Sequence, residues 1–273
     1  MERDANLYER TLDNIETHDS SLLEQMRSAV RECNTTTALR ILDLGCNTGA
    51  HIDALSRFGN VTGVDSSPAL IKQAQEKHPA ANFIVADMCA LPFDDSFDVV
   101  FSDNVFHWLP DHVALLKSVA TALSDGGILI AEMGAEGNIA HVEAGYTWAL
   151  KQHSGDYSCQ FCFPREASYH RLLKIAGFEV EFSEVFDQPT RLAQGRVGLR
   201  LLAERLFTRS LGLYQEDDRK AILDDLERAC ESNLWDAHAG CWTIDFRRLR
   251  FTARKVRNTS RAGGASQLNI LGT

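Results

Sequence analysis

The chain has 273 residues, 44% of them hydrophobic and 24% charged, with a formal net charge of −10 at pH 7. This balance is typical of a globular protein with one large α/β domain or two smaller ones. Its acidity argues against a nucleic-acid partner, because phosphate recognition needs a basic surface. The polar start of the chain and the lack of a long apolar run predict no export and no membrane partner. The cysteines are scattered and odd in number, which favours reduced thiols and a cytoplasmic location.

Residues 1–37 are expected to form an N-terminal helical lid, because apolar side chains recur near helical spacing in this segment. Five apolar segments are then predicted to be buried strands: 38–45, 60–67, 81–87, 97–104 and 126–134. Helices are predicted between them over 51–58, 67–78 and 113–123, the second capped by Ser67 and started by Pro68. The alternation predicts a Rossmann-like α/β fold, a doubly wound, mostly parallel sheet over 38–134 that binds ligands at the carboxyl ends of its strands.

The character of the sequence changes beyond residue 134, where helical insertions are expected. A helix over 165–177 ends in Gly177, a strand follows over 178–187, and 195–235 is largely helical. We assign 135–241 to acceptor-pocket insertions plus the penultimate strand, 242–257 to the last strand of the core and 258–273 to a flexible tail. Three arginines of the last strand, Arg247, Arg248 and Arg250, are expected to be solvated or to protect a sheet edge.

Acidic residues follow the first three predicted strands at even spacing. Asp43 is expected in the turn after the first strand, and Asp65 and Asp87 close the second and third. Gly45 and Gly49 allow a tight loop beside Asp43. An acid roughly 20 positions after such a loop can bind the two ribose hydroxyls of a nucleoside, a position that Asp65 occupies. The alternative is that the three acids cap the helices that follow each strand.

The loop favours one nucleoside cofactor over another. A dinucleotide fingerprint needs glycine at 45, 47 and 50, whereas this chain has Gly45, Asn47 and Ala50. An NAD(P)-dependent oxidoreductase on the same fold is therefore the alternative from another class. An acid at position 43 suits a ligand with a cationic amino-acid end and a sulfonium, which describes S-adenosyl-L-methionine. Asp87 would then accept from the adenine amino group, beside the amide of Met88.

The segments ILDLGCNTG, VTGVDSSPALIKQAQ, FIVADMCALPFDDSFDVVFSDNVFHWLPD and LSDGGILIAEMG resemble the successive motifs of class I S-adenosylmethionine-dependent methyltransferases. The nearest group is that of the trans-aconitate and malonyl-carrier-protein methyltransferases. The resemblance implies an antiparallel terminal hairpin, methyl transfer, and S-adenosyl-L-homocysteine as product. The predicted cofactor-binding residues are Tyr8, Asp43, Gly45, Cys46, Asn47, Gly49, Asp65, Ser66, Asp87, Met88, Ser102 and Asn104.

The acceptor is predicted to be a small, apolar specialised metabolite methylated on carbon, oxygen or nitrogen, because aromatic side chains gather in the insertions. Its predicted contacts are Trp108, Tyr146, Tyr157, Phe161, Phe163 and Phe207, with His107 as a catalytic residue that positions the acceptor and is not a base. The alternative is a carboxylate O-methyltransferase, for which a cationic clamp is available from Lys151, Arg165, Arg200 and Arg205. A further alternative is a catalytically idle cofactor-binding protein.

Two further predictions concern metals and assembly. The pair Cys159 and Cys162 lacks the second half of a zinc-site pattern, so we predict no metal and assign both thiols to core packing or pocket lining. The amphipathic N-terminal helix offers a surface for a homo-oligomer.

Overall fold

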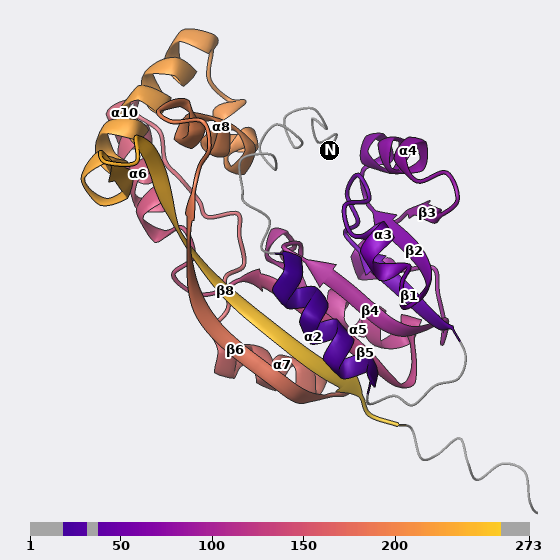
Figure 1. The fold of residues 1–273 in the computed structure, drawn as a ribbon. Helices are drawn as coiled ribbons and strands as arrows, with labels where there is room; N and C mark the ends of the chain where they lie inside the picture. Colours follow the sequence, from indigo (N-terminus) through magenta and orange to yellow (C-terminus); the bar gives the residue numbers. More distant parts are fainter. Residues whose placement is uncertain (1–18, 32–37, 258–273) are drawn as a thin grey trace, which may run out of the picture.

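The order of the strands decides where the sheet can bind a ligand. The computed structural model describes residues 19–31 and 38–257, and its central sheet has the strand order β3-β2-β1-β4-β5-β8-β6 (Figure 1). The parallel strands are β1 (Leu39–Leu44), β2 (Gly59–Asp65), β3 (Asn82–Val85), β4 (Phe97–Asp103) and β5 (Leu123–Gly134). The order reverses between β1 and β4, the point at which open parallel sheets bind ligands. The predicted doubly wound, mostly parallel sheet is confirmed.

Two long antiparallel strands complete the sheet. β8 (Cys241–Lys255) lies between β5 and β6 (Phe178–Arg191) and pairs with both, and the short β7 (Trp235–Asp236) pairs with the start of β8. The terminal antiparallel hairpin is therefore confirmed, with a helical insertion between its two strands.

Helices cover both faces of the sheet. Leu22 and Met26 of α2 (Asp19–Arg31) pack on Ile130 and neighbouring strand residues, together with α3 (Ile52–Leu55). The opposite face is covered by α5 (His112–Ala122) and α7 (Glu166–Ile175), and α4 (Pro68–Lys77) follows β2. Ser67 caps α4 as predicted, since its hydroxyl accepts from the Leu70 amide at 3.4 Å. No helix of residues 19–31 and 38–257 is both long and apolar enough to cross a membrane.

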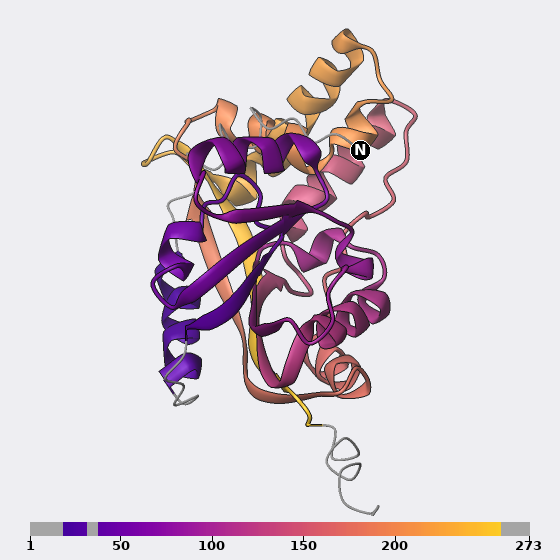
Figure 2. The same ribbon diagram turned by 90° about the vertical axis from the view of Figure 1, so that its right-hand side faces the viewer.

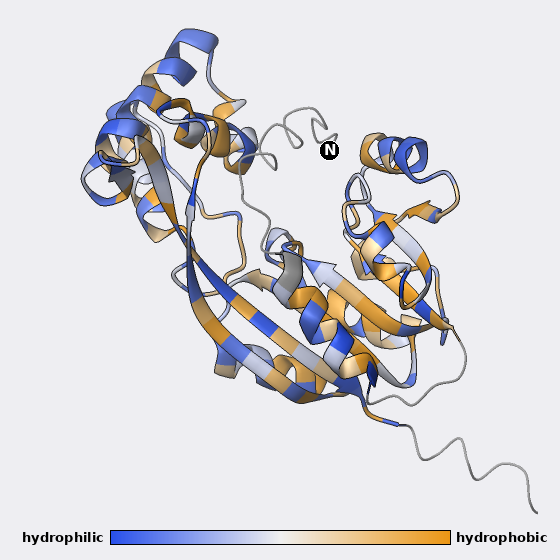
Figure 3. Ribbon diagram, in the orientation of Figure 1, coloured by the Kyte–Doolittle hydropathy of each residue, from blue (hydrophilic) through white to orange (hydrophobic). Residues whose placement is uncertain are grey.

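A helical cap with its own apolar core lies beyond the carboxyl ends of the parallel strands (Figures 1 and 2). It consists of α6 (Ala140–Gln152), α8 (Val197–Leu206), α9 (Thr208–Leu211) and α10 (Glu216–Leu234). Figure 3 shows hydrophobic residues along the central strands and hydrophilic residues on the outer surface of the cap. The cap core meets the sheet at the short 3₁₀ helix η2 (Phe106–Trp108), because Trp108 packs against the cap core.

The expectation that all three β8 arginines are solvated or protect an edge is wrong for Arg248 and Arg250. Their exposed fractions are 6% and 8%, because β8 is an inner strand and both side chains point to the face that α2 covers. Only Arg247, on the opposite face, is substantially exposed, and it pairs with Asp187 at 2.6 Å.

Candidate active site

Asp43 is the most deeply buried acid of the site. It lies within β1, one residue before the end of the strand and not in the following turn, and is 1% exposed. Its Oδ2 atom is buried and has no hydrogen-bond partner among the described residues. The pKa of Asp43 is raised to about 6, because burial and the charges of Asp103 and Asp65 raise it by more than the charge of His51 lowers it. Because this carboxylate is buried beside other acids, a cationic ligand would stabilise it.

The loop after β1 folds tightly because three of its residues take left-handed backbone angles. Gly45 and Gly49 have φ values of 83° and 88°, and Asn47 has a φ of 56°. A Cβ at Gly45 would meet Val105 Cγ2 at 2.3 Å, so this position has no room for a side chain. The buried Cys46 side chain packs inside the loop, and burial raises the pKa of its thiol. The loop therefore keeps its turn although asparagine replaces glycine at position 47.

Asp65 ties this loop to β2. Its Oδ1 atom accepts from the Ser67 amide at 2.9 Å, and its Oδ2 atom accepts from the Asn47 amide at 3.3 Å. The side chain is buried, whereas the adjacent Ser66 is exposed. A carboxylate held in this way is rigid and keeps lone pairs for further donors.

Asp87 caps the helix that follows its strand, as the alternative interpretation of the three acids predicts. It is exposed, lies two residues beyond β3, and its Oδ1 accepts from the Cys89 amide at 2.9 Å as the N-cap of the 3₁₀ helix η1 (Met88–Ala90). Its second oxygen stays available to a ligand. Met88 beside it is buried.

At the end of β4, Ser102 and Asn104 differ in whether they have a polar atom left for a ligand. Ser102 is 0% exposed and donates its hydroxyl to the Leu44 carbonyl at 2.7 Å, so it links β4 to β1 and is not on the surface of the crevice. Asn104 has a φ of 57° and donates from Nδ2 to Asp103 Oδ1 at 2.8 Å. Its own Oδ1 is buried without a partner in the described part of the chain.

His51 and Asp103 belong to the site although the sequence analysis did not select them. His51 Nε2 lies 3.3 Å from Asp103 Oδ2, and both side chains are largely buried. His51 sits at the start of α3 with its ring edge against Phe101, at 5.2 Å between centroids. Asp103 is the last residue of β4, the position that Asp65 holds in β2, and an acid at the end of a further predicted strand is the signal that could have pointed to it.

The predicted acceptor residues form one continuous aromatic cluster. Trp108 packs edge-on to Phe161 at 4.8 Å, Phe161 stacks on Phe163 at 5.3 Å, and Phe161 reaches Phe207 at 6.5 Å. Phe207 stacks on Tyr146 at 3.9 Å. The cluster runs from η2 into the cap, and its half-buried members are Trp108 and Phe163 at the sheet end and Tyr157 in the cap.

The far end of the aromatic cluster is packed into the core of the cap. Tyr146 and Phe207 are both 0% exposed, and the Tyr146 hydroxyl donates to Ser210 at 2.8 Å. The Tyr157 hydroxyl donates to Glu143 at 2.9 Å, and burial raises the pKa of Tyr157. These contacts explain the three residues as core of the cap.

His107 is held at the sheet end of the cluster. The Gly134 amide donates to its Nδ1 atom at 3.3 Å, so the neutral ring carries its proton on Nε2. Its ring lies 5.7 Å from that of Phe163. Neither ring nitrogen then offers a lone pair, and the geometry suits a positioning role better than that of a base.

A row of charges crosses the sheet next to this point. Arg250 donates to Glu132 Oε2 from Nε at 2.8 Å and from a terminal nitrogen at 2.6 Å, and it also reaches Glu184 at 3.3 Å. Arg248, one step nearer the strand ends, donates from Nε to Gln188 at 3.1 Å. Burial lowers the pKa of Arg248, although a guanidinium keeps its charge throughout the ordinary pH range.

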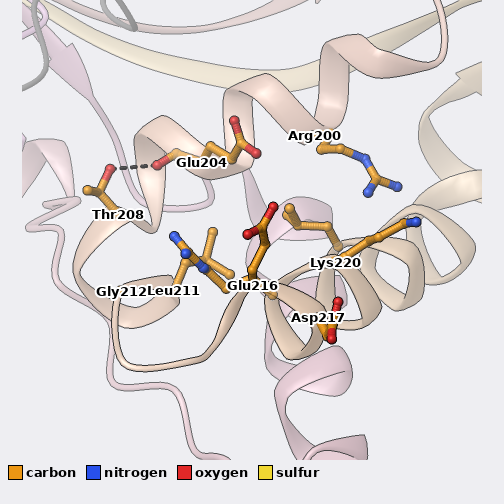
Figure 4. A pocket seen from close by; sticks show the side chains of 10 residues that line it. Arg200, Glu204, Thr208, Leu211, Gly212, Glu216, Asp217 and Lys220 are labelled. Atoms are coloured by element: carbon orange, nitrogen blue, oxygen red, sulfur yellow. Dashed lines mark hydrogen bonds between the residues drawn. The ribbon is translucent and has the colours of Figure 1, made fainter.

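Three of the four predicted cationic clamp residues lie elsewhere, whereas the charge of the fourth, Arg205, acts on Arg248 and lowers its pKa. Arg165 is exposed and paired with Glu136, and Lys151 is exposed on α6. Arg200 donates to Glu227 and Asp224 on the outer side of the cap. There it borders an open groove of about 790 Å³ between α8, α9 and the start of α10 (Figure 4). The groove contains no residue of a strand end and carries charges of both signs, so it is separate from the crevice.

Two other predictions meet the structure only in part. Tyr8 and the rest of the proposed lid before residue 19 lie outside the described residues. Cys159 is exposed and donates to Glu143, and Cys162 is half-buried. Within the described ranges, no three His, Cys, Asp or Glu side chains are grouped to hold a metal ion.

The unpaired polar atoms test whether S-adenosylmethionine suits the site. Asp43, Asn47 and Asn104 each bury an oxygen acceptor without a donor from the described residues. A buried acceptor left unpaired costs about 1–3 kcal/mol, so three of them around one loop call for a ligand that brings donors. The ammonium and hydroxyl groups of S-adenosylmethionine are such donors, and the residues fit it.

Comparison with known proteins also indicates an S-adenosylmethionine-dependent methyltransferase. A methyltransferase domain family matches residues 42–131. An uncharacterized methyltransferase of Schizosaccharomyces pombe is 31% identical over 246 residues, covering 84% of this chain and 91% of the relative. A trans-aconitate 2-methyltransferase of Rhodopseudomonas palustris is 37% identical over 97 residues, covering 34% of this chain and only 38% of the relative. A phosphoethanolamine N-methyltransferase of Haemonchus contortus, solved with S-adenosylhomocysteine, has a TM-score of 0.56 at 20% identity over 93% of this chain and 57% of that chain.

The sheet order, the acids at the ends of β1 and β2 and these likenesses define an S-adenosylmethionine-dependent enzyme on a Rossmann-like fold. The chain belongs to the methyltransferase family, and its cofactor is S-adenosyl-L-methionine. The choice between this cofactor and a dinucleotide, which the loop sequence alone left open, is thereby made.

Proposed function

We propose that the chain transfers the methyl group of S-adenosylmethionine to a small molecule whose apolar part packs on Trp108 and Phe163. The observation that carries the proposal is the half-buried sheet end of the aromatic cluster, next to the crevice that holds the unpaired acceptors. Aromatic faces bind apolar surface and attract cationic charge, both of which suit methyl transfer from a sulfonium.

The proposed cofactor contacts divide among three strands. The unpaired oxygens of Asp43 and Asn47 would accept from the methionine ammonium, Asp65 from the ribose hydroxyls, and Asp87 from the adenine amino group beside Met88. Bound S-adenosylmethionine supplies an activated methyl group, so the chain's own task is chiefly to orient the acceptor and exclude water.

Two acceptor chemistries are considered. A small apolar specialised metabolite suits the aromatic wall. The trans-aconitate 2-methyltransferases among the relatives act on a carboxylate-rich compound by their name, which makes carboxylate O-methylation the second candidate. A cytoplasmic location, a role in specialised metabolism, the absence of nucleic-acid partners and a homo-oligomer through the N-terminal helix stay predictions of the sequence.

The test begins with calorimetric titration of the purified protein with S-adenosylhomocysteine and NADPH. We expect binding of the first alone, followed by methylation of members of a panel of neutral apolar metabolites and carboxylic acids, detected by mass spectrometry. Trp108→Ala should raise the acceptor KM without changing S-adenosylhomocysteine affinity. Trp148→Ala, a change of the 45% exposed tryptophan on the outside of α6, is the matched control and should change neither. Equal effects of the two substitutions would contradict the proposed acceptor wall.

A further inference from the structure

Arg248 and Arg250 are both buried in the charge row, but of the two only Arg250 makes hydrogen bonds to carboxylates of the described residues. Arg250 takes both close contacts to Glu132, a third to Glu184 and a fourth to the Ser21 hydroxyl at 2.6 Å. For Arg248 the nearest carboxylate oxygen of Glu132 is 4.0 Å from Nε, and the neutral Gln188 amide is its hydrogen-bond partner. A buried guanidinium whose nearest carboxylate lies at 4.0 Å without a hydrogen bond is costly to keep, so Arg248 suits a ligand that brings a carboxylate within hydrogen-bond distance.

The orientation of Arg248 leaves the two terminal nitrogens of its guanidinium available to a ligand. Gln188 holds Nε, and the Phe246 ring lies under the guanidinium at 4.4 Å from Cζ. Among the described residues, the Arg248 side chain makes its hydrogen bond through Nε alone. The two terminal nitrogens form the parallel pair of donors that binds a carboxylate in a bidentate manner.

Arg248 also lies beside the proposed acceptor wall. It pairs with Gly134 across β5 and β8, and residues directly opposite in an antiparallel pair project to the same face. On that face a Cβ at Gly134 would meet the Phe163 ring at 2.5 Å, so the missing side chain lets Phe163 approach. The Gly134 amide also fixes His107. Arg248, Phe163 and His107 are therefore all neighbours of Gly134.

This point is separate from the cofactor acids. Asp43 is on β1, and β8 is three strands away in the sheet, which at about 4.8 Å per strand is roughly 14 Å. β4 and β5 lie between the two. Arg248 is thus in the acceptor half of the crevice.

We propose that Arg248 is the specificity-determining residue of this chain and binds a carboxylate of the methyl acceptor through its two terminal nitrogens. The inference rests on the proposed function and names its substrate class, an acid with an apolar or planar body. Where that carboxylate is itself methylated, its oxygen forms the new bond to the methyl carbon, and the carbon–sulfur bond breaks with its electron pair passing to sulfur. No proton is lost, because the acid is already ionised near neutral pH.

The experiment compares acids with their neutral amides on the full chain saturated with S-adenosylhomocysteine. The probes are trans-aconitate and cinnamate, each with the corresponding amide, and binding is measured by calorimetry. We expect the acid of at least one pair to bind 10-fold or more tighter than its amide, the factor expected for a charge-assisted contact. Arg248→Gln should remove that preference, Arg248→Lys should restore part of it, and both should bind S-adenosylhomocysteine as the wild type does. Arg247→Gln, a change of the neighbouring exposed arginine, is the matched control.

The outcomes are separable. Failure of the wild type to bind S-adenosylhomocysteine would refute the proposed function. Normal cofactor binding with no acid preference in the wild type would refute the role of Arg248, and this comparison needs no variant to fold. An acid preference that survives Arg248→Gln would refute it too. If Arg248→Gln weakens S-adenosylhomocysteine itself, Arg248 belongs to the cofactor site and the inference is overturned.

Discussion

Replacing Asp43 by asparagine should stabilise the free protein near neutral pH while weakening its cofactor site. Burial raises the pKa of this carboxyl from 3.8 to about 6. A difference of about two pKa units corresponds to about 3 kcal/mol of unfolding free energy, because each unit is worth about 1.4 kcal/mol. The free protein carries this cost so that an ionised acid is ready at the end of β1.

The sign follows from the protons bound in each state. Between the unfolded and folded pKa values the folded protein binds more protons than the unfolded chain, so the contribution of Asp43 to stability falls as the pH rises through this window. The cost is nearly absent at about pH 4 and complete above about pH 7. Asp43→Asn removes it, and any pH-independent cost of the new amide cancels when two pH values are compared.

The assay is urea unfolding of the free wild type and of Asp43→Asn across this pH range. We expect the difference in unfolding free energy to shift in favour of the variant by about 2 kcal/mol between about pH 4 and pH 7. Asp98→Asn is the control: burial alone would raise the pKa of Asp98, but the hydrogen bonds and charge of Arg40 lower it, so its titration lies below about pH 4 and its difference should stay nearly constant across the assay. A difference for Asp43→Asn that is as constant with pH as that of Asp98→Asn, or that shifts against the variant as the pH rises, would refute the reasoning.

Three further outcomes are expected. Asp65→Ala should weaken S-adenosylhomocysteine binding about 10- to 150-fold in calorimetry, the range for a lost hydrogen bond to a charged group, with circular dichroism showing an intact fold; unchanged affinity would remove Asp65 from the site. Gly45→Ala should lower the unfolding free energy by at least 1–3 kcal/mol more than Gly177→Ala, because both positions have positive φ but only the first would drive a Cβ into Val105. Glu132→Gln should cost about 3–5 kcal/mol in urea unfolding, since it removes the buried carboxylate that makes the two closest contacts to Arg250 and leaves only the more exposed Glu184, and a cost below 1 kcal/mol would show that solvent and Glu184 compensate the charge.

Local patterns account for what the sequence could predict. Asp65 and Gly45 are predictable because a strand, a tight loop and a following helix are each encoded within a few neighbouring residues. The Ser67 cap is found for the same reason, and the structure places it as expected. The switch point between β1 and β4 follows from the alternation of strands and helices, which the topology confirms.

The burial of Arg248 and Arg250 could not be predicted from local patterns. Whether Arg248 is solvated depends on which strands flank β8, and these come from distant parts of the chain. One signal was present: Trp242, Ile244 and Phe246 share its face by the two-residue period of a strand, and all three are buried. His51 was missed because its partner Asp103 is reached only across the sheet, a contact that no spacing along the chain reveals.

The insertion of β8 between β5 and β6 has a consequence for synthesis on the ribosome. Translation proceeds from the N-terminus, so β5 and β6 both emerge before the strand that separates them. Until Cys241–Lys255 arrives, each has an edge of unpaired backbone amides and carbonyls that could join the other in a wrong register or capture a second nascent chain. The half of the molecule proposed to select the acceptor is thus the last to be completed, and it is where chaperone binding during translation should be sought.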